Sequence, residues 1–368
     1  MSNEKVKGDE VDMNYRSLII LYCLQKLNGE RSIFGAFHLL VGKKSSQTIS
    51  DGQLYQLAHL FGTLNHLTRE QVEESADFLL KNTFIYEIDP NSYKYSLTNK
   101  GENILADILD QKPLPKELNG WKYFDKSSLF WKRLSLLTQV LSNLVYTNKD
   151  YVTIQQDEEL LEWVKHFLAT QKLNRADLAI KLYNECLLCL EQVTELEASI
   201  FVMRLTSSNK IGYTIEQVSA FYGEDETWFH LLFINSLHSI LAYIEENTLD
   251  FSILSLLVVT HNDMLTLTSS TRKTYHFLLQ GKTIEEIASI RKLKKNTIED
   301  HVVEITYNVP NFSIKPYVSK KHELKIITSL QQIDTKQLRL LKESVGDGIT
   351  YFEIRLVLAK CGVVHESK

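Results

Sequence analysis

The chain has 368 residues, 44% of them hydrophobic and 24% charged, with a formal net charge of −5. This composition is typical of a globular protein with two or three cores that need no disulfide staples. The sequence has no run of about 18 uncharged apolar residues to span a membrane, and the polar start MSNEKVKGDEVD lacks a signal-peptide apolar region, so we expect a cytoplasmic protein with no membrane partner.

Helices are expected along most of the chain. Only five prolines and 14 glycines interrupt it, and apolar residues recur at spacings of three and four. Residues 13–40 indicate two helices broken near Asn28 and Gly29. Further along, Thr68 and Gln71 are placed as a capping box that begins another helix. The fold class is therefore predicted to be mainly α, with several domains.

A short hairpin is predicted next, in TFIYEIDPNSYKYSLTNKG, where two β-prone runs flank the turn signal DPNS. Helix, hairpin and the LTNKG ending resemble the end of a winged-helix domain, although a plain packing unit has the same pattern. If a wing is present, Tyr93 and Lys94 near its tip are candidates to touch a DNA backbone. Winged helices also serve as protein docking surfaces.

The loop in HLLVGKKSSQTISD, residues 38–51, is a second candidate contact. We hypothesise that Lys43, Lys44 and Gln47 are exposed there and meet a partner protein or a DNA backbone; an ordinary solvated lysine loop is the alternative. The proline-containing stretch QKPLPKELNG, residues 111–120, marks a domain boundary.

Charge is segregated between the middle and the C-terminal part. Residues 150–262 hold 6 basic and 17 acidic side chains, a net of −11, whereas residues 266–330 hold 11 and 6. The middle segment would be repelled by phosphates, and the later one attracted. The stretch beginning at Thr214 echoes the stretch beginning at Thr283, but it has GEDE where the later copy has RKLKK, which favours a structural or protein-binding role.

A helix-turn-helix is predicted in GKTIEEIASIRKLKKNTIEDHVVEI. Gly281 ends a helix that begins near Ser269 and buries Tyr275, Phe277 and Leu278, and Thr283 with Glu286 forms the next capping box. A third helix starts around Asn296 and buries Ile298, Val302 and Ile305. The turn lacks the glycine that a positive φ favours, which leaves its geometry open.

Basic and polar residues gather where this third helix begins, at the end that enters a major groove in such motifs. Glu299 and Asp300 follow directly and oppose DNA contact, so a solvated basic turn is the alternative. The candidate DNA-binding residues here are Lys282, Arg291, Lys292, Lys294, Lys295, Asn296, Thr297 and His301.

Motifs for catalysis or metal binding are missing from the sequence. GKKSS resembles the end of a phosphate loop, but the first glycine of such a loop is replaced by Phe37. Cys186 and Cys189 have no second pair to complete a zinc site, and buried thiols are the simpler interpretation. We expect no enzyme activity, catalytic residue, metal, cofactor or small-molecule substrate.

The C-terminal region resembles the helix-turn-helix domain at the C-terminus of some RecQ-family helicases. The resemblance covers about residues 268–360, through the motif above and the ending GITYFEIRLVLAK. HLLVGKKSSQTISD and the winged-helix-like segment extend it to the bacterial YpbB family. The resemblance implies a helicase-associated accessory protein, because genes of this family typically neighbour that of a RecQ-type helicase.

The predicted organisation is a winged-helix-like domain at 14–112, an acidic helical domain at 121–263, and a helix-turn-helix domain with C-terminal helices at 266–365. The predicted function is a non-catalytic DNA-binding accessory protein of a RecQ-type helicase in DNA repair or recombination, with the helicase and DNA as partners. A helix-turn-helix transcription regulator and a protein adaptor that does not touch DNA remain alternatives.

Overall fold

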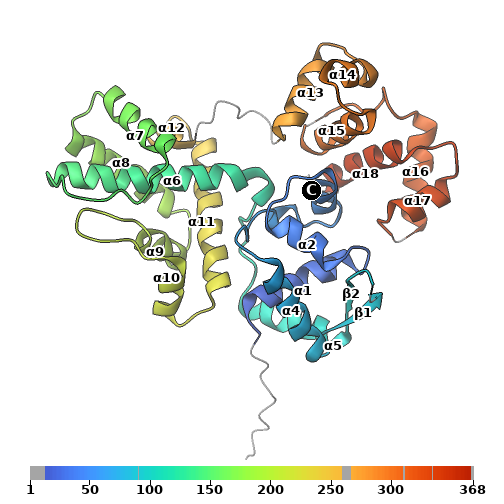
Figure 1. The fold of residues 1–368 in the computed structure, drawn as a ribbon, viewed down its shortest axis with the longest axis horizontal. Coiled ribbons are helices and arrows are strands. Elements are labelled where there is room, and N and C mark those ends of the chain that lie inside the picture. Colours follow the sequence, from blue (N-terminus) through green and yellow to red (C-terminus); the bar gives the residue numbers. More distant parts are fainter. Residues whose placement is uncertain (1–12, 90, 259–266, 310, 334, 366–368) are drawn as a thin grey trace, which may run out of the picture.

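The computed structural model describes residues 13–89, 91–258, 267–309, 311–333 and 335–365. This part of the chain is mainly helical, as predicted, with one two-stranded sheet. Three groups of helices follow one another along the sequence, and Figure 1 shows the middle group on one side and the C-terminal group on the other, with the N-terminal group between them.

The N-terminal group is built around α1, which is buried on nearly all sides. Asn14 caps it by accepting a hydrogen bond from the Ser17 backbone, and the chain reverses at Asn28 and Gly29, both with positive φ, where the sequence predicted a break. Gly29 lies directly under Ile88 of the hairpin, where a Cβ atom would come within 2.1 Å of Ile88 Cδ1. The elements are α1 (Tyr15–Leu27), α2 (Ile33–Leu40), α3 (Ser46–Leu54) and the 3-10 turn η1 (Ala58–Leu60).

The predicted helix and hairpin follow in that order, and a further helix begins at the LTNKG ending. Thr68 and Gln71 form the expected capping box of α4, and Thr98 caps α5 by accepting from the Gly101 backbone. The strands pair antiparallel, with Ile85 opposite Leu97. The elements are α4 (Arg69–Lys81), β1 (Ile85–Asp89), β2 (Lys94–Leu97) and α5 (Asn99–Gln111).

The middle group is organised by two long helices, α6 and α11. Helix α11 has the length and mean hydropathy of a membrane-crossing helix, but 56% of that window is buried inside the fold. Phe229 and Phe233 lie in the core of the middle group, whereas Leu231 of the same helix lies in the N-terminal core. The helices are α6 (Gly120–Val145), α7 (Glu158–Thr170), α8 (Arg175–Leu190), α9 (Glu195–Met203), α10 (Ile215–Tyr222), α11 (Glu226–Glu246) and α12 (Leu254–Val258).

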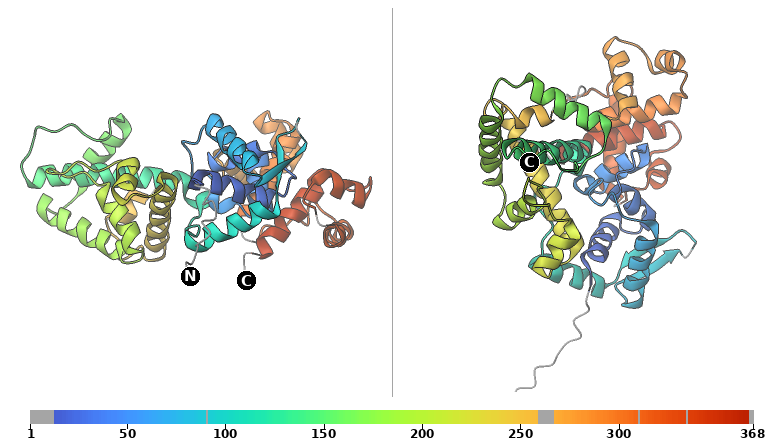
Figure 2. Two further views of the ribbon diagram at one scale, coloured as in Figure 1. Left: turned by 90° about the horizontal axis from the view of Figure 1, so that it is seen from below. Right: turned by 60° about the vertical axis from the view of Figure 1, so that its left-hand side comes forward.

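The C-terminal group consists of the helix-turn-helix and three helices that pack beside it. Helix α3 of the N-terminal group lies against α15 and α18, and Glu30 accepts hydrogen bonds from the Thr335 hydroxyl (2.7 Å) and the Lys336 backbone. Figure 2 shows this contact between the two groups from two further sides. The helices are α13 (Ser269–Leu279), α14 (Ile284–Arg291), α15 (Lys295–Asn308), α16 (Lys320–Gln332), α17 (Leu338–Val345) and α18 (Tyr351–His365).

Candidate nucleic-acid interface

The helix-turn-helix has the helices that the sequence predicted, and the structure supplies the geometry of its turn. Thr283 and Glu286 form a complete capping box at the start of α14, and α14 crosses α15 with Ile287 fully buried between them. The turn needs one left-handed residue, and Lys292 takes this conformation itself (φ +52°, ψ +42°). A lysine therefore occupies a backbone position that glycine usually prefers.

Most of the predicted contact residues of the turn reach solvent. Lys292, Lys294 and Asn296 are exposed, and within the described residues the first two form no ion pair. Lys282 and Lys295 are also exposed, but their ammonium groups lie 3.9 Å from Glu286 Oε1 and 2.9 Å from Glu285 Oε1, respectively. Such exposed pairs are weak, because water and salt screen them.

The half-buried Thr297 completes the exposed first turn of α15. Lys294 is the N-cap of this helix and makes no side-chain capping bond, and the first turn contains no carboxylate. The Thr297 backbone N–H donates to the Lys294 carbonyl (3.0 Å), but the N–H groups before it have no partner within the helix, and the helix dipole is positive there. This end of α15 is therefore suited to an anion such as a DNA phosphate.

Arg291 and His301 were predicted to face DNA, but the structure places them inside the motif. The Arg291 guanidinium donates to the Ser270 carbonyl (2.8 Å), the Ser270 hydroxyl (3.0 Å) and the Thr274 hydroxyl. The Thr274 hydroxyl donates in turn to His301 Nδ1 (2.8 Å). Burial, together with the nearby Arg291 charge, lowers the pKa of His301 to about 4, so the ring is neutral at pH 7. These two residues hold α14 and α15 to α13.

A second polar cluster in the motif was not predicted. We expected α13 to bury Tyr275, Phe277 and Leu278; these three are half-buried, and the fully buried residues of α13 are threonines. The buried Glu304 carboxylate accepts from the Thr268 backbone (2.5 Å) and from the Thr271 hydroxyl (2.6 Å). The signal for this cluster was the polar spacing of three in TSSTRKT, which hydrophobic periodicity does not detect.

Helix α15 is accessible only at its N-terminal end. From Ile298 onward its sides are covered by α13, α14, α18 and α3. The Asp300 carboxylate forms an ion pair with Arg355 of α18, and the Glu299 side chain is 20% exposed, 4.0 Å from Lys295. The two carboxylates that opposed DNA contact in the sequence are therefore partly neutralised by neighbouring cations.

The hairpin of β1 and β2, which carries Tyr93 and Lys94, lies away from α13, α14 and α15 and beside α1 (Figure 1). Tyr93 has a positive φ (+53°), its carbonyl accepts from the Ile33 backbone, and its ring packs edge-on against Phe34 with centroids 5.1 Å apart. Lys94 of β2 lies opposite Asp89 of β1 in the register of the two strands. The exposed face of the preceding helix α4 carries four carboxylates, Glu70, Glu73, Glu74 and Asp77.

Lys43, Lys44 and Gln47 are exposed, as hypothesised for their loop. Lys44 forms an ion pair with Asp125 at the start of α6 and lies 5.9 Å from the centre of the Phe124 ring. The helix that follows this loop, α3, contacts the C-terminal group. The loop therefore lies where all three groups of helices meet. It is separate from the turn between α14 and α15.

Comparison with known proteins gives a family for the whole chain. Residues 270–358 match the family described as a helix-turn-helix domain. The chain is 37% identical over 350 residues to Protein YpbB of Bacillus subtilis (strain 168), covering 95% of this chain and 98% of that protein. No solved structure matches significantly. Because the similarity extends over nearly the full length of both proteins, the chain belongs to the YpbB family.

Proposed function

We propose that this chain is a non-catalytic DNA-binding accessory protein of a RecQ-type DNA helicase, and that it acts in the cytoplasm in DNA repair or recombination. The observation that carries the DNA-binding part is the turn before α15, where Lys292 and Lys294 are exposed beside an uncapped helix end. The helix-turn-helix family supports the same interpretation. The helicase partnership rests on the resemblance described above.

The mode of contact follows from how little of α15 is accessible. Reading base edges requires several side chains of a recognition helix to enter the major groove. Here only the first turn of α15 is exposed, and its outward side chains are lysines and Asn296. We therefore propose that the turn contacts mainly phosphates, which gives affinity and a strong salt dependence with little sequence preference.

The test is a double charge reversal, Lys292→Glu with Lys294→Glu, in the full chain. Binding to a labelled duplex is measured by fluorescence anisotropy at several salt concentrations. We expect at least about tenfold weaker binding, and a salt slope reduced by about 2, since two phosphate contacts are lost. The matched control is Lys172→Glu with Lys181→Glu, which makes the same charge change on exposed residues near and within α8. Equal losses in both double variants would contradict a specific role of the turn.

Two rival functions give different results in the same assay. A transcription regulator would prefer one duplex sequence and bind as a dimer to two half-sites, whereas we expect similar affinity for unrelated duplexes. A pure adaptor would bind no duplex at all. The helicase partnership is tested by purifying the tagged full chain from native lysate and identifying the bound chains; recovery without a RecQ-type helicase would contradict it.

A further inference from the structure

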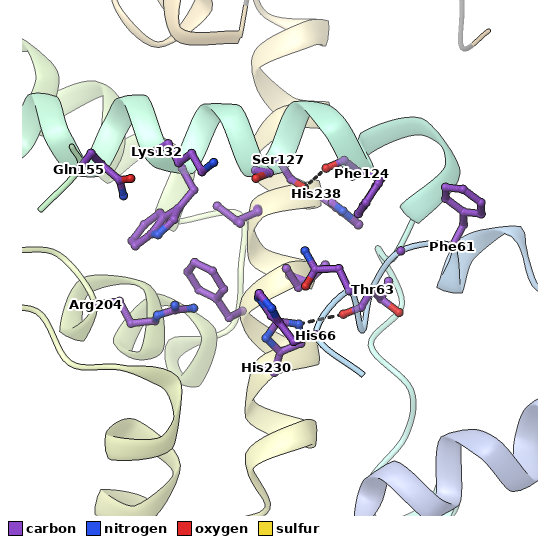
Figure 3. Close-up of a pocket in the computed structure, with 17 residues that line it drawn as sticks. Phe61, Thr63, His66, Phe124, Ser127, Lys132, Gln155, Arg204, His230 and His238 are labelled. Atoms are coloured by element: carbon purple, nitrogen blue, oxygen red, sulfur yellow. Dashed lines mark hydrogen bonds between the residues drawn. The ribbon is translucent and has the colours of Figure 1, made fainter. Parts of the chain in front are cut away.

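A pocket of about 210 Å³ lies between the N-terminal and middle groups, far along the chain from the α14–α15 turn. Helices α6 and α11 form two of its walls, and the segment after η1 forms another (Figure 3). Arg204, at the end of α9, and Gln155, in the loop before α7, close its remaining side. Ligand sites commonly lie at such junctions between domains.

Arg204 is the unusual residue of this pocket. Its guanidinium lies 3.9 Å from the centre of the Phe233 ring and 5.6 Å from that of Trp131, and its side chain extends toward the other lining residues (Figure 3). Its Nε atom is buried without a hydrogen-bond partner, and the guanidinium forms no ion pair within the described residues. Burial lowers the pKa of Arg204 to about 10, so the side chain remains charged at neutral pH.

This charge has no acceptor of its own. A guanidinium carries five N–H donors and no acceptor, and leaving a buried donor unsatisfied is costly. The Glu216 carboxylate acts on Arg204 through its charge alone, with no ion pair between the two in the described part of the chain. The aromatic rings hold the guanidinium in place through cation–π contact, which leaves its two terminal NH2 groups, and not the buried Nε–H, as the donors for a ligand.

The rest of the lining also favours an anion. None of the 17 lining residues is Asp or Glu, although residues 150–262 carry a net charge of −11. Lys132 adds a second positive charge, and Asn65, His66 and Gln155 offer side chains with no partner among the described residues. Burial lowers the pKa of His230 to about 4 and of His238 to about 3, so these two rings are neutral and do not repel Arg204.

We propose that this pocket binds a phosphate monoester, held by Arg204 and Lys132, with the adjoining part of the ligand against Trp131 and Phe233. Two cations match the charge of the phosphate, and the planar fork of an arginine binds phosphate oxygens in pairs. The pocket is smaller than the roughly 300–1,000 Å³ typical for drug-sized ligands, so it holds a small molecule or the end of a longer one. The phosphate belongs either to a free mononucleotide or to the 5′ end of a DNA strand.

The experiment measures ligand binding to the full chain by isothermal titration calorimetry. The probes are inorganic phosphate, a 5′-mononucleotide, and a short single strand with either a 5′-phosphate or a 5′-hydroxyl end. Four proteins are compared: the unchanged chain, Arg204→Gln, Lys132→Gln and Arg339→Gln. The last removes the same charge from an 81% exposed side chain on α17. Lys132 is exposed, so its replacement tests the site even if Arg204→Gln fails to fold.

We expect the unchanged chain and Arg339→Gln to bind with equal affinity, and the two pocket variants to bind at least about tenfold more weakly, since a charge-assisted bond is lost. Saturation by the mononucleotide identifies a free small molecule, and preference for the 5′-phosphorylated strand over its 5′-hydroxyl counterpart identifies a strand end. The proposal is overturned if no probe gives saturable binding, or if Lys132→Gln binds like the unchanged chain. Because Lys292 and Lys294 are intact in all four proteins, failure here leaves the proposed DNA contact of the turn unaffected.

Discussion

Two three-helix units of this chain share their caps, turn conformation and helix contacts, and differ in charge and surroundings. In the middle unit (α9, α10 and α11), Thr214 caps α10 in a capping box, Gly223 takes the left-handed conformation (φ +69°), and Asp225 caps α11. In the C-terminal unit (α13, α14 and α15), the corresponding residues lie 69 positions later. Thr283 caps α14, Lys292 takes the left-handed conformation, and Lys294 is the N-cap of α15. The echo between Thr214 and Thr283 in the sequence is therefore accompanied by equivalent caps and an equivalent left-handed turn residue.

The turn of the middle unit is occupied by the N-terminal group. Asp225 accepts a hydrogen bond from the Tyr15 backbone (3.0 Å), and Glu224 forms an ion pair with Lys112. Leu231, on the helix that corresponds to the recognition helix, is buried in the N-terminal core. The same turn in the C-terminal unit carries lysines that face solvent. The unit with the acidic turn thus packs against the N-terminal group of the same chain. The unit with the basic turn presents a candidate DNA contact to solvent.

Both units also tie the first helix to the third through a buried carboxylate. In the middle unit Asn235 of α11 donates to Glu197 of α9 (2.7 Å). In the C-terminal unit the carboxylate is on the third helix, and Thr271 of α13 donates to Glu304 of α15 (2.6 Å). Asn235 and Glu304 again lie 69 positions apart. The carboxylate is on the first helix in the middle unit and on the third helix in the C-terminal unit, but in both units it connects the same two helices.

The largest effect is expected from breaking these connections. Glu304→Ala leaves the donors of Thr268 and Thr271 without their carboxylate acceptor. Asn235→Ala leaves Glu197 Oε1 and the Glu117 backbone N–H without these partners, while Glu197 Oε2 still accepts from Thr194. Each should lower the free energy of unfolding by about 2–4 kcal/mol. Urea unfolding followed by circular dichroism measures it.

The control for both variants is Glu343→Ala, whose side chain is 60% exposed on α17 and pairs with Arg339. We expect this change to stay within about 0.5 kcal/mol of the unchanged chain. If only one of the two buried substitutions lowers the free energy of unfolding more than the control does, the two connections are not equivalent in the two units.

A pH effect is expected at the junction that involves the middle unit. His238 Nδ1 accepts from the Asn119 backbone (3.0 Å), and burial lowers the pKa of the ring to about 3. A lowered pKa stabilises the fold above the unfolded value of about 6.5, and this contribution is lost as the pH falls toward 3. His238→Asn keeps an acceptor but does not titrate. Its unfolding free energy should fall less steeply below pH 6.5, by up to about 1.4 kcal/mol per pH unit. Parallel pH profiles of the two proteins would show that His238 is not the titrating group.

The elements that follow local rules could be predicted from the sequence. The capping boxes at Thr68 and Thr283 and the helix-turn-helix depend on residues three or four positions apart, and the hairpin depends on its turn signal; each is where the sequence placed it. The exposed lysines of the turn were identified because charge clusters on solvated surfaces are visible in sequence. The left-handed turn residue was identified only as a region, because lysine carries no signal for positive φ.

The long-range polar contacts could not be predicted. Arg291 has the charge of a DNA contact, and only its distance to Ser270 and Thr274 shows that it is used inside the fold. Arg204 and Trp131 are 73 positions apart in the sequence, and nothing local indicates that they share a pocket. Such contacts depend on how separate helices pack, which periodicity within one helix does not determine.

A smaller effect is expected from exchanging the left-handed turn residues. Lys292→Gly should raise the free energy of unfolding by up to about 1 kcal/mol, because glycine tolerates φ +52° better, and yet weaken duplex binding severalfold, because one phosphate contact is lost. Gly223→Ala in the middle unit should lower the free energy of unfolding by about 1 kcal/mol. The new Cβ would meet no atom within 4 Å, so the loss comes from backbone strain alone. Duplex binding should not change. Urea unfolding and anisotropy on the same samples measure both quantities. Stronger duplex binding by Lys292→Gly would show that backbone strain, and not charge, governs this turn.

The smallest expected effect concerns the carboxylate that competes with phosphate at the basic turn. Glu285 Oε1 lies 2.9 Å from the Lys295 ammonium group, and this contact lowers the pKa of Glu285, so the carboxylate is charged wherever DNA binding is measured. Glu285→Gln removes this charge and leaves Lys295 to a phosphate. We expect duplex affinity to rise about two- to threefold at low salt and the gain to shrink as salt is added, because both the pair and the new contact are screened. Glu343→Gln, which removes a similarly exposed carboxylate from the Arg339 pair on α17, should leave the affinity unchanged. A gain of the same size in both variants would reflect net charge alone, and would remove Lys295 from the set of residues that contact DNA.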